Sequence, residues 1–442
     1  MSIDFRVRDF LFPRAIWRLH REFDRNQWLP PDQLEEYQLS RLRRILSRAY
    51  ESVPYYREVF KAKRLHPADV ESVADLRVFP TLPKETVREN GARLLADDAQ
   101  RRRLVSCSTS GSSGEPLHFY LDRNSQTLEF CYYWRYWSWS GYRLGMFTAE
   151  LGSHHFLVRD EMANRAIHLQ RPLRRLLLNS NLVSEAGCRE MAEALRRHRP
   201  RFLKGVSSAL YFFALELKRL GISDIHFDAV FSTGDLVTDL HRQLIEEVFS
   251  SQVRDSYGHM ERTVAVSQCP EGGYHINSDY GVLEVERCSG PHGENGLGRV
   301  LGTSLHNLAM PLIRYEVGDT VELFPDDRRC SCGRAFPLLK AIHGREEDIV
   351  LTPDGRFITA LFIVPKFVAG IRGIQFIQAE DDKLVALVVP DAEWNQRSSE
   401  ALLEYTRRTV GPSMRVELRQ VGLRDLVRDA SGKVRTIIGR KS

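Results

Sequence analysis

The sequence predicts an α/β fold with a largely parallel sheet, followed by a small α+β domain. Strand and helix signals alternate in the middle of the chain. The β-prone runs 201–205 and 228–231 are each followed by an amphipathic helical segment, at 209–220 and 238–249. Such alternation is typical of parallel strands joined by helices that pack on the sheet. Residues 345–442 carry further strand signals, and we expect them to form the smaller domain.

Composition and charge favour a folded protein with a small anionic ligand. The 442 residues are 43% apolar and 27% charged, as in ordinary globular proteins, and this length is enough for two or three domains. A net charge of +5 fits a nucleotide ligand but is too small to predict nucleic-acid binding. We find neither an apolar run long enough for a membrane span nor a signal-peptide pattern, so we expect a cytoplasmic location.

Residues 1–103 are rich in arginine and carry helical signals. Pro31 and Asp32 can start a helix, because the first turn tolerates the missing N–H of proline and favours an acidic side chain. Apolar residues then recur at helical spacing until Pro54 breaks the pattern. We expect this region to pack on the large domain, either as a helical module or as a lid.

A loop rich in glycine and hydroxyl residues follows a strand signal at 104–105. Its residues are Thr109, Ser110, Gly111, Ser112, Ser113 and Gly114. The backbone N–H groups and hydroxyls of such a loop can surround phosphate oxygens, although the pattern is neither a Walker A loop nor GxGxxG. A solvated hairpin turn is the alternative. The aromatic run 130–142 that follows is more typical of core packing on a helix than of a ligand platform.

Six short motifs follow one another along the chain. They are TSGSSGEP at 109–116, STGD at 232–235, YGHME at 257–261, RYEVGD at 314–319, GREED at 344–348 and SGKVR at 431–435. In this order they resemble the adenylate-forming superfamily of acyl-CoA synthetases, peptide-synthetase adenylation domains and luciferases. The N-terminal region and the stretch from RYEVGD to CxCGR are most similar to the phenylacetate–CoA ligase-like branch. That branch includes coenzyme F-390 synthetase-like and capsule-biosynthesis-type relatives.

The resemblance implies a two-step reaction that uses ATP, Mg²⁺ and usually coenzyme A. A carboxylate attacks the α-phosphate of ATP, which gives an acyl-adenylate and pyrophosphate, and a thiol then attacks the acyl carbon and releases AMP. Both steps need neutralisation of charge more than a nucleophile from the protein. We therefore expect an acyl- or aryl-CoA ligase for an aromatic or bulky acid. Two alternatives are a ligase that transfers the acyl group to an amine, sugar, cofactor or carrier protein, and a non-catalytic scaffold that kept the fold.

The same resemblance gives the motif residues roles in nucleotide binding. The loop residues 109–114 would hold the β- and γ-phosphates. Tyr257 matches the aromatic residue that stacks on adenine, and Gly258 lies at the floor of that pocket. Asp319 matches the carboxylate that accepts both ribose hydroxyls, and its Gly-Asp pair is expected to end a strand. Four residues match the segment that lines the adenine: Ser232, Thr233, Gly234 and Asp235.

Three charged residues match catalytic positions of the superfamily. Glu261 matches the carboxylate that coordinates Mg²⁺, although Met260 replaces the threonine that usually precedes it. Arg345 matches an arginine near the ribose and phosphate. Lys433 matches the lysine that bridges the reacting carboxylate and the α-phosphate, where its ammonium offsets negative charge. A solvated turn lysine is the alternative for Lys433.

The resemblance also implies a core at 104–344 and a mobile C-terminal domain at 345–442 that carries the lysine. This domain would rotate after adenylation about a hinge at 344–348, where Glu347 replaces the usual Asp or Lys. The carboxylic acid is expected near Trp134, Trp137, residues 204–208 and residues 257–260.

Seven cysteines in a chain of this length do not indicate a disulfide framework, but four residues suggest a metal site. Cys330 and Cys332 form a compact thiol pair, and Cys269 and His275 lie upstream. Three thiols and an imidazole can bind zinc tetrahedrally, although C-x-C is tighter than the usual C-x₂-C. The phenylacetate–CoA ligase-like branch often has this arrangement, which implies a structural Zn²⁺. Buried unpaired thiols are the alternative, and Cys288 is another candidate ligand.

Overall fold

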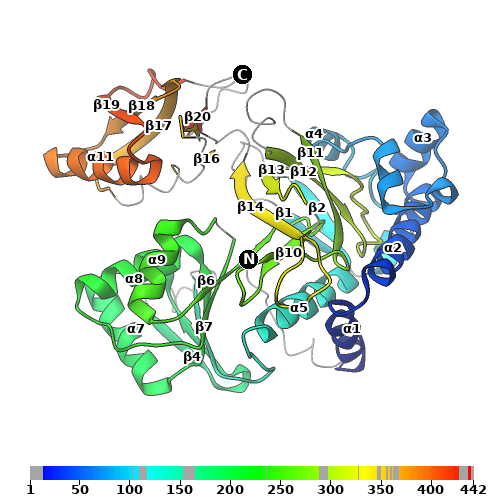
Figure 1. The fold of residues 1–442 in the computed structure, drawn as a ribbon, viewed down its shortest axis with the longest axis horizontal. Coiled ribbons are helices and arrows are strands. Elements are labelled where there is room, and N and C mark those ends of the chain that lie inside the picture. Colours follow the sequence, from blue (N-terminus) through cyan, green and yellow to red (C-terminus); the bar gives the residue numbers. More distant parts are fainter. Residues whose placement is uncertain are drawn as a thin grey trace.

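The computed structural model shows a mixed α/β protein built on one large sheet, with a smaller sheet near the C-terminus (Figure 1). It describes residues 13–102, 104–108, 117–152, 165–234, 236–287, 297–326, 328–345, 350–354, 357–358, 361, 368–427 and 437–439. Within these residues the large sheet has twelve strands in the order β11-β12-β13-β14-β10-β9-β8-β7-β6-β3-β5-β4. The predicted α/β fold class is confirmed, but the expectation of a largely parallel sheet is wrong, because most neighbouring strands of the large sheet pair antiparallel. The sheet consists of a parallel half and an antiparallel half.

The parallel half corresponds to the region where strand and helix signals alternate. Its parallel strands are β3 (Thr148–Leu151), β5 (Arg175–Leu178), β6 (Phe202–Val206), β7 (Ala229–Thr233) and β8 (Val253–Gly258). The antiparallel strand β4 (Ile167–Gln170) forms the edge. Helices α7 (Glu185–His198), α8 (Ser207–Arg219) and α9 (Asp239–Phe249) pack against these strands and appear in green in Figure 1. Their apolar faces and the strands share one buried cluster, as expected for helical crossovers.

The antiparallel half joins the parallel half where β9 pairs with β8. Its strands are β9 (Ala265–Gln268), β10 (Tyr274–Ile276), β11 (Gly281–Arg287), β12 (Leu297–Ser304), β13 (Tyr315–Leu323) and β14 (Leu338–Arg345). The expectation that Gly318 and Asp319 end a strand is wrong, because both lie inside β13. Arg299 pairs with Thr320 and Leu301 with Glu316, so residues 317–319 face one residue of β12 and form a bulge. Gly318 has a φ of +82°, a conformation that favours glycine.

The N-terminal region is helical and packs on the antiparallel half. Its helices are α1 (Pro13–Asn26), α2 (Pro31–Ser52), α3 (Pro54–Lys63) and α4 (Lys84–Glu89), and short 3₁₀ turns span Pro67–Asp69, Val73–Val78 and Ala99–Arg102. As expected, α2 begins at the Pro31-Asp32 pair and ends just before Pro54. Leu42 and Ile45 of α2 belong to the same buried cluster as Tyr315 and Val321 of β13. The hairpin strands β1 (Val105–Ser108) and β2 (His118–Leu121) contribute to this cluster as well.

The aromatic helix α5 (Arg123–Ser138) contacts both halves of the sheet. Its Arg135 is fully buried and donates to both carboxylate oxygens of Asp279, at 2.6 and 3.0 Å. Tyr136 packs on Phe231 of β7, with 5.5 Å between ring centroids, while Tyr132 donates a hydrogen bond to the backbone carbonyl of Val266. The prediction of core packing for this aromatic run is therefore confirmed for most of its residues. Two further 3₁₀ turns, Arg171–Leu173 and Ser180–Leu182, lie in the parallel half.

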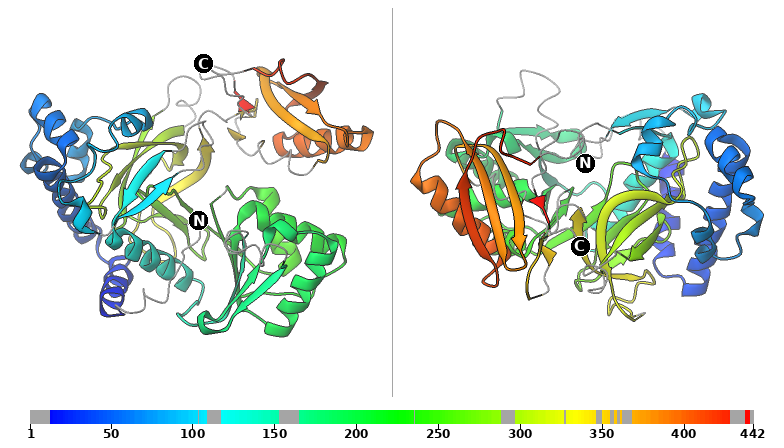
Figure 2. Two further views of the ribbon diagram at one scale, coloured as in Figure 1. Left: turned by 180° about the vertical axis from the view of Figure 1, so that it is seen from behind. Right: turned by 90° about the horizontal axis from the view of Figure 1, so that it is seen from above.

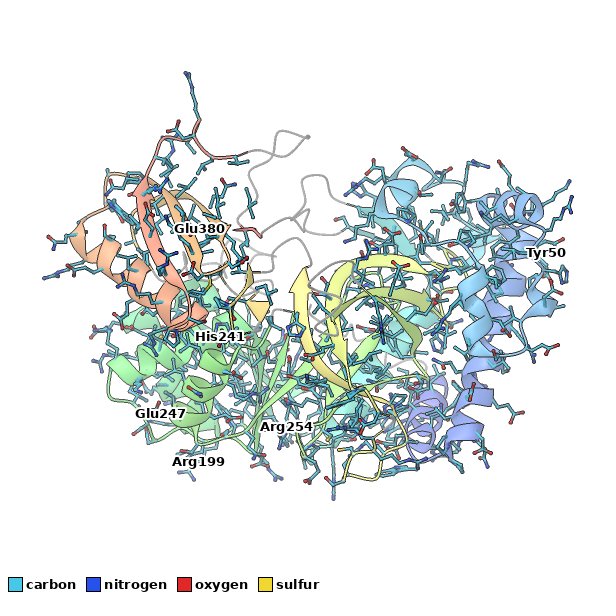
Figure 3. The ribbon with its side chains drawn as sticks, turned by 45° about the horizontal axis from the view of Figure 1, so that its top comes forward. Tyr50, Arg199, His241, Glu247, Arg254 and Glu380 are labelled. Carbon is cyan, nitrogen blue, oxygen red and sulfur yellow. The ribbon has the colours of Figure 1, made fainter. Side chains whose placement is uncertain are left out.

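The C-terminal sheet forms a smaller unit with a core of its own. It contains β17 (Ile371–Glu380), β18 (Lys383–Pro390), β19 (Arg415–Gln420) and β20 (Ile437–Ile438), covered by α11 (Gln396–Val410), and the short pair β15 (Val350–Leu351) and β16 (Phe357–Ile358) precedes it. Figures 1 and 2 show this unit in orange, on the opposite side of the molecule from the blue N-terminal helices. Figure 3 shows the same separation between Glu380 of β17 and Tyr50 of α2. None of the described helices is long and apolar enough to cross a bilayer.

Candidate active site

The central parallel strands β6, β7 and β8 end at the same edge of the sheet. Their register places Thr233 of β7 beside Ser256 of β8. Ligands of open parallel sheets bind beyond the carboxyl ends of the strands. The structure therefore brings the predicted adenine segment Ser232–Gly234 next to Tyr257, while Asp235 lies outside the described residues.

Two predicted nucleotide-binding residues contact each other at this edge. Tyr257 Oη donates a hydrogen bond to Asp319 Oδ2 at 2.9 Å, although the two residues are separated by 62 positions in the sequence. Asp319 lies in the bulge of β13, and its backbone pairs with that of Arg345 on β14. An aromatic ring and a carboxylate thus stand side by side, as a nucleoside site requires. The side chain of Arg345 lies outside the described part of the chain.

Glu261 is buried, with 5% of its surface exposed, in the turn that follows β8. Tyr315 Oη donates a hydrogen bond to its Oε1 at 2.6 Å, and His259 Nδ1 lies 3.1 Å from its Oε2. Burial alone would raise the pKa of this carboxyl group, but the hydrogen bonds and the charge of His259 lower the pKa to about 2. Glu261 is therefore ionised at neutral pH. Met260, in place of the usual threonine, packs against the hydrophobic cluster beneath the antiparallel half.

Several predicted site residues lie outside the described residues. These are the phosphate-loop residues Thr109, Ser110, Gly111, Ser112, Ser113 and Gly114, the hinge residue Glu347 and the candidate catalytic lysine Lys433. Strands β1 and β2 flank the predicted phosphate loop. Ser108, which precedes the loop, pairs with His118, which follows it. The predicted roles of these residues stay predictions.

An aromatic cavity of about 240 Å³ lies beside the carboxyl ends of β6 and β7. Thr233 and Ser256 belong to its wall and so connect it with the segment next to Tyr257. The cavity is lined mainly by aromatic rings: Phe130, Tyr133, Tyr136, Trp137, Tyr142 and Phe231. Its charged lining residues are Glu150, Arg174, Arg175 and Lys204. It has the concave, mostly apolar character of a small-molecule site with a few placed polar groups.

The sequence identified only part of this cavity. Trp137 and Lys204 line it as expected, but Trp134 stacks on His20 of α1 with 3.6 Å between ring centroids. Tyr133 and Tyr136 also line the cavity and were not predicted. Tyr133 and Trp137 are separated by one helical turn on α5, which places them on the same face of the helix. The sequence carried no comparable signal for Glu150 and Arg175, because β3 and β5 are short and lie on separate parts of the chain.

The four predicted zinc ligands converge between β9, β10 and the loop that precedes β14. One ligand atom from each of Cys269, His275, Cys330 and Cys332 lies within 4.8 Å of the other three. Cys269 Sγ is 3.5 Å from Cys330 Sγ, and Cys332 Sγ is 3.3 Å from His275 Nε2. The Nδ1 of His275 lies 3.2 Å from the carbonyl of Phe336, which leaves Nε2 facing the thiols. Cys288 lies outside the described residues.

The chain is similar in sequence to several known proteins. Residues 350–440 match the family model of the CapK C-terminal domain. The chain is 23% identical to Protein CapK of Staphylococcus aureus over 356 residues, which cover 79% of this chain and 77% of the relative. It is 26% identical to a phenylacetate-coenzyme A ligase of Pseudomonas putida over 344 residues, 72% of each chain.

Among solved structures, a 2-hydroxyisobutyryl-CoA ligase in the postadenylation state, in complex with R3-HIB-AMP, superposes with a TM-score of 0.64. The match has 18% sequence identity and covers 94% of this chain and 92% of the ligase, so it demonstrates a shared fold. Together with the sequence relatives, it confirms the resemblance indicated by the six motifs. Both the sequence relatives and the shared fold support a likeness to the phenylacetate–CoA ligase-like branch of the adenylate-forming superfamily.

Proposed function

We propose that this chain is an ATP-dependent, AMP-forming ligase that activates a carboxylic acid as an acyl-adenylate and transfers the acyl group to coenzyme A. The observation that carries this proposal is the hydrogen bond between Tyr257 and Asp319, beside an aromatic cavity. A base-stacking ring and a ribose-binding carboxylate must stand side by side to hold one nucleoside. The relatives named phenylacetate-coenzyme A ligase support the same reaction class.

Asp319 is suited to binding the ribose because a carboxylate has two oxygen atoms, and each of them can accept a hydrogen bond from one ribose hydroxyl. In our proposal Tyr257 stacks on the adenine, and Ser232, Thr233, Gly234 and Asp235 line its edge. Gly258 would lie at the floor, and Arg345 would approach the phosphates from the strand beside Asp319.

Charge neutralisation in our proposal comes from three places. The loop 109–114 would hold the β- and γ-phosphates, and Lys433 would bridge the reacting carboxylate and the α-phosphate. Glu261 would hold Mg²⁺, which would offset phosphate charge. Its low pKa suits a metal ligand, although both of its oxygens already accept hydrogen bonds and one of them would have to exchange. Movement of residues 345–442 about the segment 344–348 would then admit the acceptor.

We also propose that Cys269, His275, Cys330 and Cys332 hold a structural zinc ion. The donor set and its convergence fit tetrahedral zinc. Burial lowers the pKa of His275 to about 4, so its imidazole is neutral at pH 7, as a ligand must be. The ion would connect the β9–β10 turn to the loop before β14.

The reaction is tested by carboxylate-dependent ATP–pyrophosphate exchange with a panel of aryl, fatty, amino and sugar acids. We expect exchange with one acid class and loss of exchange in Lys433→Ala. Addition of coenzyme A should then release AMP and form a thioester. Lys340→Ala is a matched control, because Lys340 is half exposed in a surface ion pair with Glu322. ATP binding without exchange for any acid would favour the non-catalytic scaffold.

Transfer to a different acceptor is the second candidate function. The observation that favours it is the match of residues 350–440 to the CapK domain, because by resemblance this part of the chain admits the acceptor. Exchange that proceeds without any release of AMP on addition of coenzyme A would support it. The same assay with amines, sugars, cofactors or an acyl-carrier protein would then identify the acceptor.

A further inference from the structure

Lys204 lines the aromatic cavity, and none of the described carboxylates forms an ion pair with its Nζ. In the sheet register it lies between Glu150 of β3 and Phe231 of β7, so the three side chains share one face of the sheet. Its Nζ lies 3.1 Å from the centroid of the Trp137 ring and 4.6 Å from that of Tyr142. Among the described residues, no hydrogen bond or ion pair reaches this ammonium. The two aromatic rings contact the ammonium through cation–π interactions, but they provide neither a hydrogen-bond acceptor nor a negative charge.

Glu150 does not neutralise the cavity. Arg175 of β5 lies 3.4 Å from Glu150 and forms an ion pair with it, and Arg174 is a further cation in the wall. The lining therefore holds three basic side chains and one carboxylate; burial lowers the pKa of Lys204 to about 7, although the charge of Glu150 acts in the opposite direction. An anionic ligand group would restore the balance of charge next to Lys204.

Two further polar groups of the cavity lack partners. Tyr136 Oη and Ser232 Oγ are buried, each in a residue that is 1% exposed, and neither has a hydrogen-bond partner among the described residues. Both residues line the same cavity as Lys204. Buried polar groups are normally paired, so unpaired ones that face a cavity point to a ligand that supplies the partner. A ligand with oxygen atoms at two places would satisfy them.

The cavity has a nucleotide end and a remote end. Val206 and Thr233 are register partners at the nucleotide end, next to Ser256 and Tyr257. Lys204 lies two residues further back along β6, which corresponds to about 6.6 Å at the usual rise of a strand. A carboxylate that meets ATP at the nucleotide end therefore belongs to a molecule whose other end approaches Lys204.

We infer that the acid activated here carries a second anionic group at its remote end, and that Lys204 is the specificity-determining residue that pairs with it. The substrate class is a dicarboxylic acid with a flat or ring-containing skeleton, because aromatic rings line the space between the two ends. This inference rests on the proposed function and makes its substrate class narrower.

The test compares acids that differ only in the remote group: phenylacetate with 4-carboxyphenylacetate, and hexanoate with adipate. In ATP–pyrophosphate exchange we expect the dianionic member of a pair to have a kcat/KM at least tenfold higher. In Lys204→Met this ratio falls to about one, mainly through KM of the dianion. Lys218→Met, an exposed lysine of α8 paired with Glu247, is the matched control and keeps the ratio. A preference for the monoanionic acids, or a ratio unchanged by Lys204→Met, would overturn the inference.

A binding measurement separates this inference from the proposed function. Because Lys204 Nζ lies over the Trp137 ring, a bound anion should change the fluorescence of that tryptophan, and Trp137→Phe identifies its share of the signal. Dianion binding that depends on Lys204, without exchange, would support the pairing of Lys204 with the remote anionic group and refute adenylation. Exchange with monoanionic acids alone would support adenylation and refute the inference about the second anionic group. Absence of any Lys204-dependent response in both assays would refute the inference.

Discussion

The two halves of the large sheet satisfy their polar groups in different ways. In the antiparallel half, Asp319 accepts from Tyr257, both oxygens of Glu261 have partners, and the four Cys and His ligand atoms face one another. In the parallel half, the cavity keeps Lys204, Tyr136 and Ser232 without hydrogen-bond partners among the described residues. The first arrangement holds a site in a fixed geometry before any ligand arrives. The second leaves its interactions for the ligand to make, which suits the part of an enzyme that selects a substrate.

Loss of a zinc ligand should produce the largest change on the antiparallel side. Cys269→Ser is expected to remove one equivalent of zinc and to lower the free energy of unfolding by several kcal/mol, because metal binding to a preformed site contributes directly to folding. Metal analysis and thermal unfolding measure both effects. Cys107→Ser, in the β1 hairpin away from the cluster, should keep the zinc. Wild-type protein without zinc would refute the proposed metal site.

Removal of the ribose carboxylate should abolish most adenylation while the fold is kept. Asp319→Asn replaces one acceptor oxygen by an NH₂ donor and removes the charge from the other, so each of two hydrogen bonds loses about 1.5–3 kcal/mol or less, which corresponds to roughly a hundredfold fall in kcat/KM for ATP. The readout is exchange at varied ATP concentration. Asp326→Asn is the control, because Asp326 lies in an exposed ion pair with Arg328 after the same strand. Equal effects of the two changes would place the nucleotide elsewhere.

The pKa of Glu261 predicts how the antiparallel side responds to acid. Its folded-state pKa of about 2 lies below the ordinary value of 4.5, so its stabilisation is fully present above about pH 4.5 and is lost as pH falls towards 2. The shift corresponds to about 3 kcal/mol in the free energy of unfolding. Denaturant unfolding between pH 2.5 and 6 should show this slope in the wild type and a smaller one in Glu261→Gln. Identical slopes would mean that the buried carboxylate is not held in its charged form.

The sequence predicted the residue types of both sites better than their contacts. Motif order identified Tyr257, Glu261 and Asp319, but not the hydrogen bond that crosses 62 positions from Tyr257 to Asp319. It also missed the bulge around Gly318, because a Gly-Asp pair indicates a turn unless the register of the partner strand is known.

The cavity was harder to predict, because its shape depends on helix orientation and on strand order. Helical spacing does not determine which face of α5 packs on β7. The sequence therefore could not indicate that Tyr136 contacts Phe231 of β7, whereas Trp134 stacks on His20 of α1. Arg175 reaches Glu150 because β5 pairs with β3, and pairing between distant short strands leaves no local pattern. Contacts of this kind are set by the whole fold, whereas motifs record chemistry that is local in sequence.

The smallest and sharpest test compares two tyrosine hydroxyls. Tyr315→Phe removes a hydrogen bond to an ionised carboxylate and should cost about 1.5–3 kcal/mol in the free energy of unfolding. Tyr136→Phe removes a hydroxyl that has no partner among the described residues, so its effect should be close to zero or slightly stabilising. Denaturant unfolding without ligand measures both. If Tyr136→Phe were as destabilising as Tyr315→Phe, the hydroxyl of Tyr136 would already have a hydrogen-bond partner in the free protein. The polar groups of the cavity would then be paired before a ligand binds, as those around Asp319 and Glu261 are.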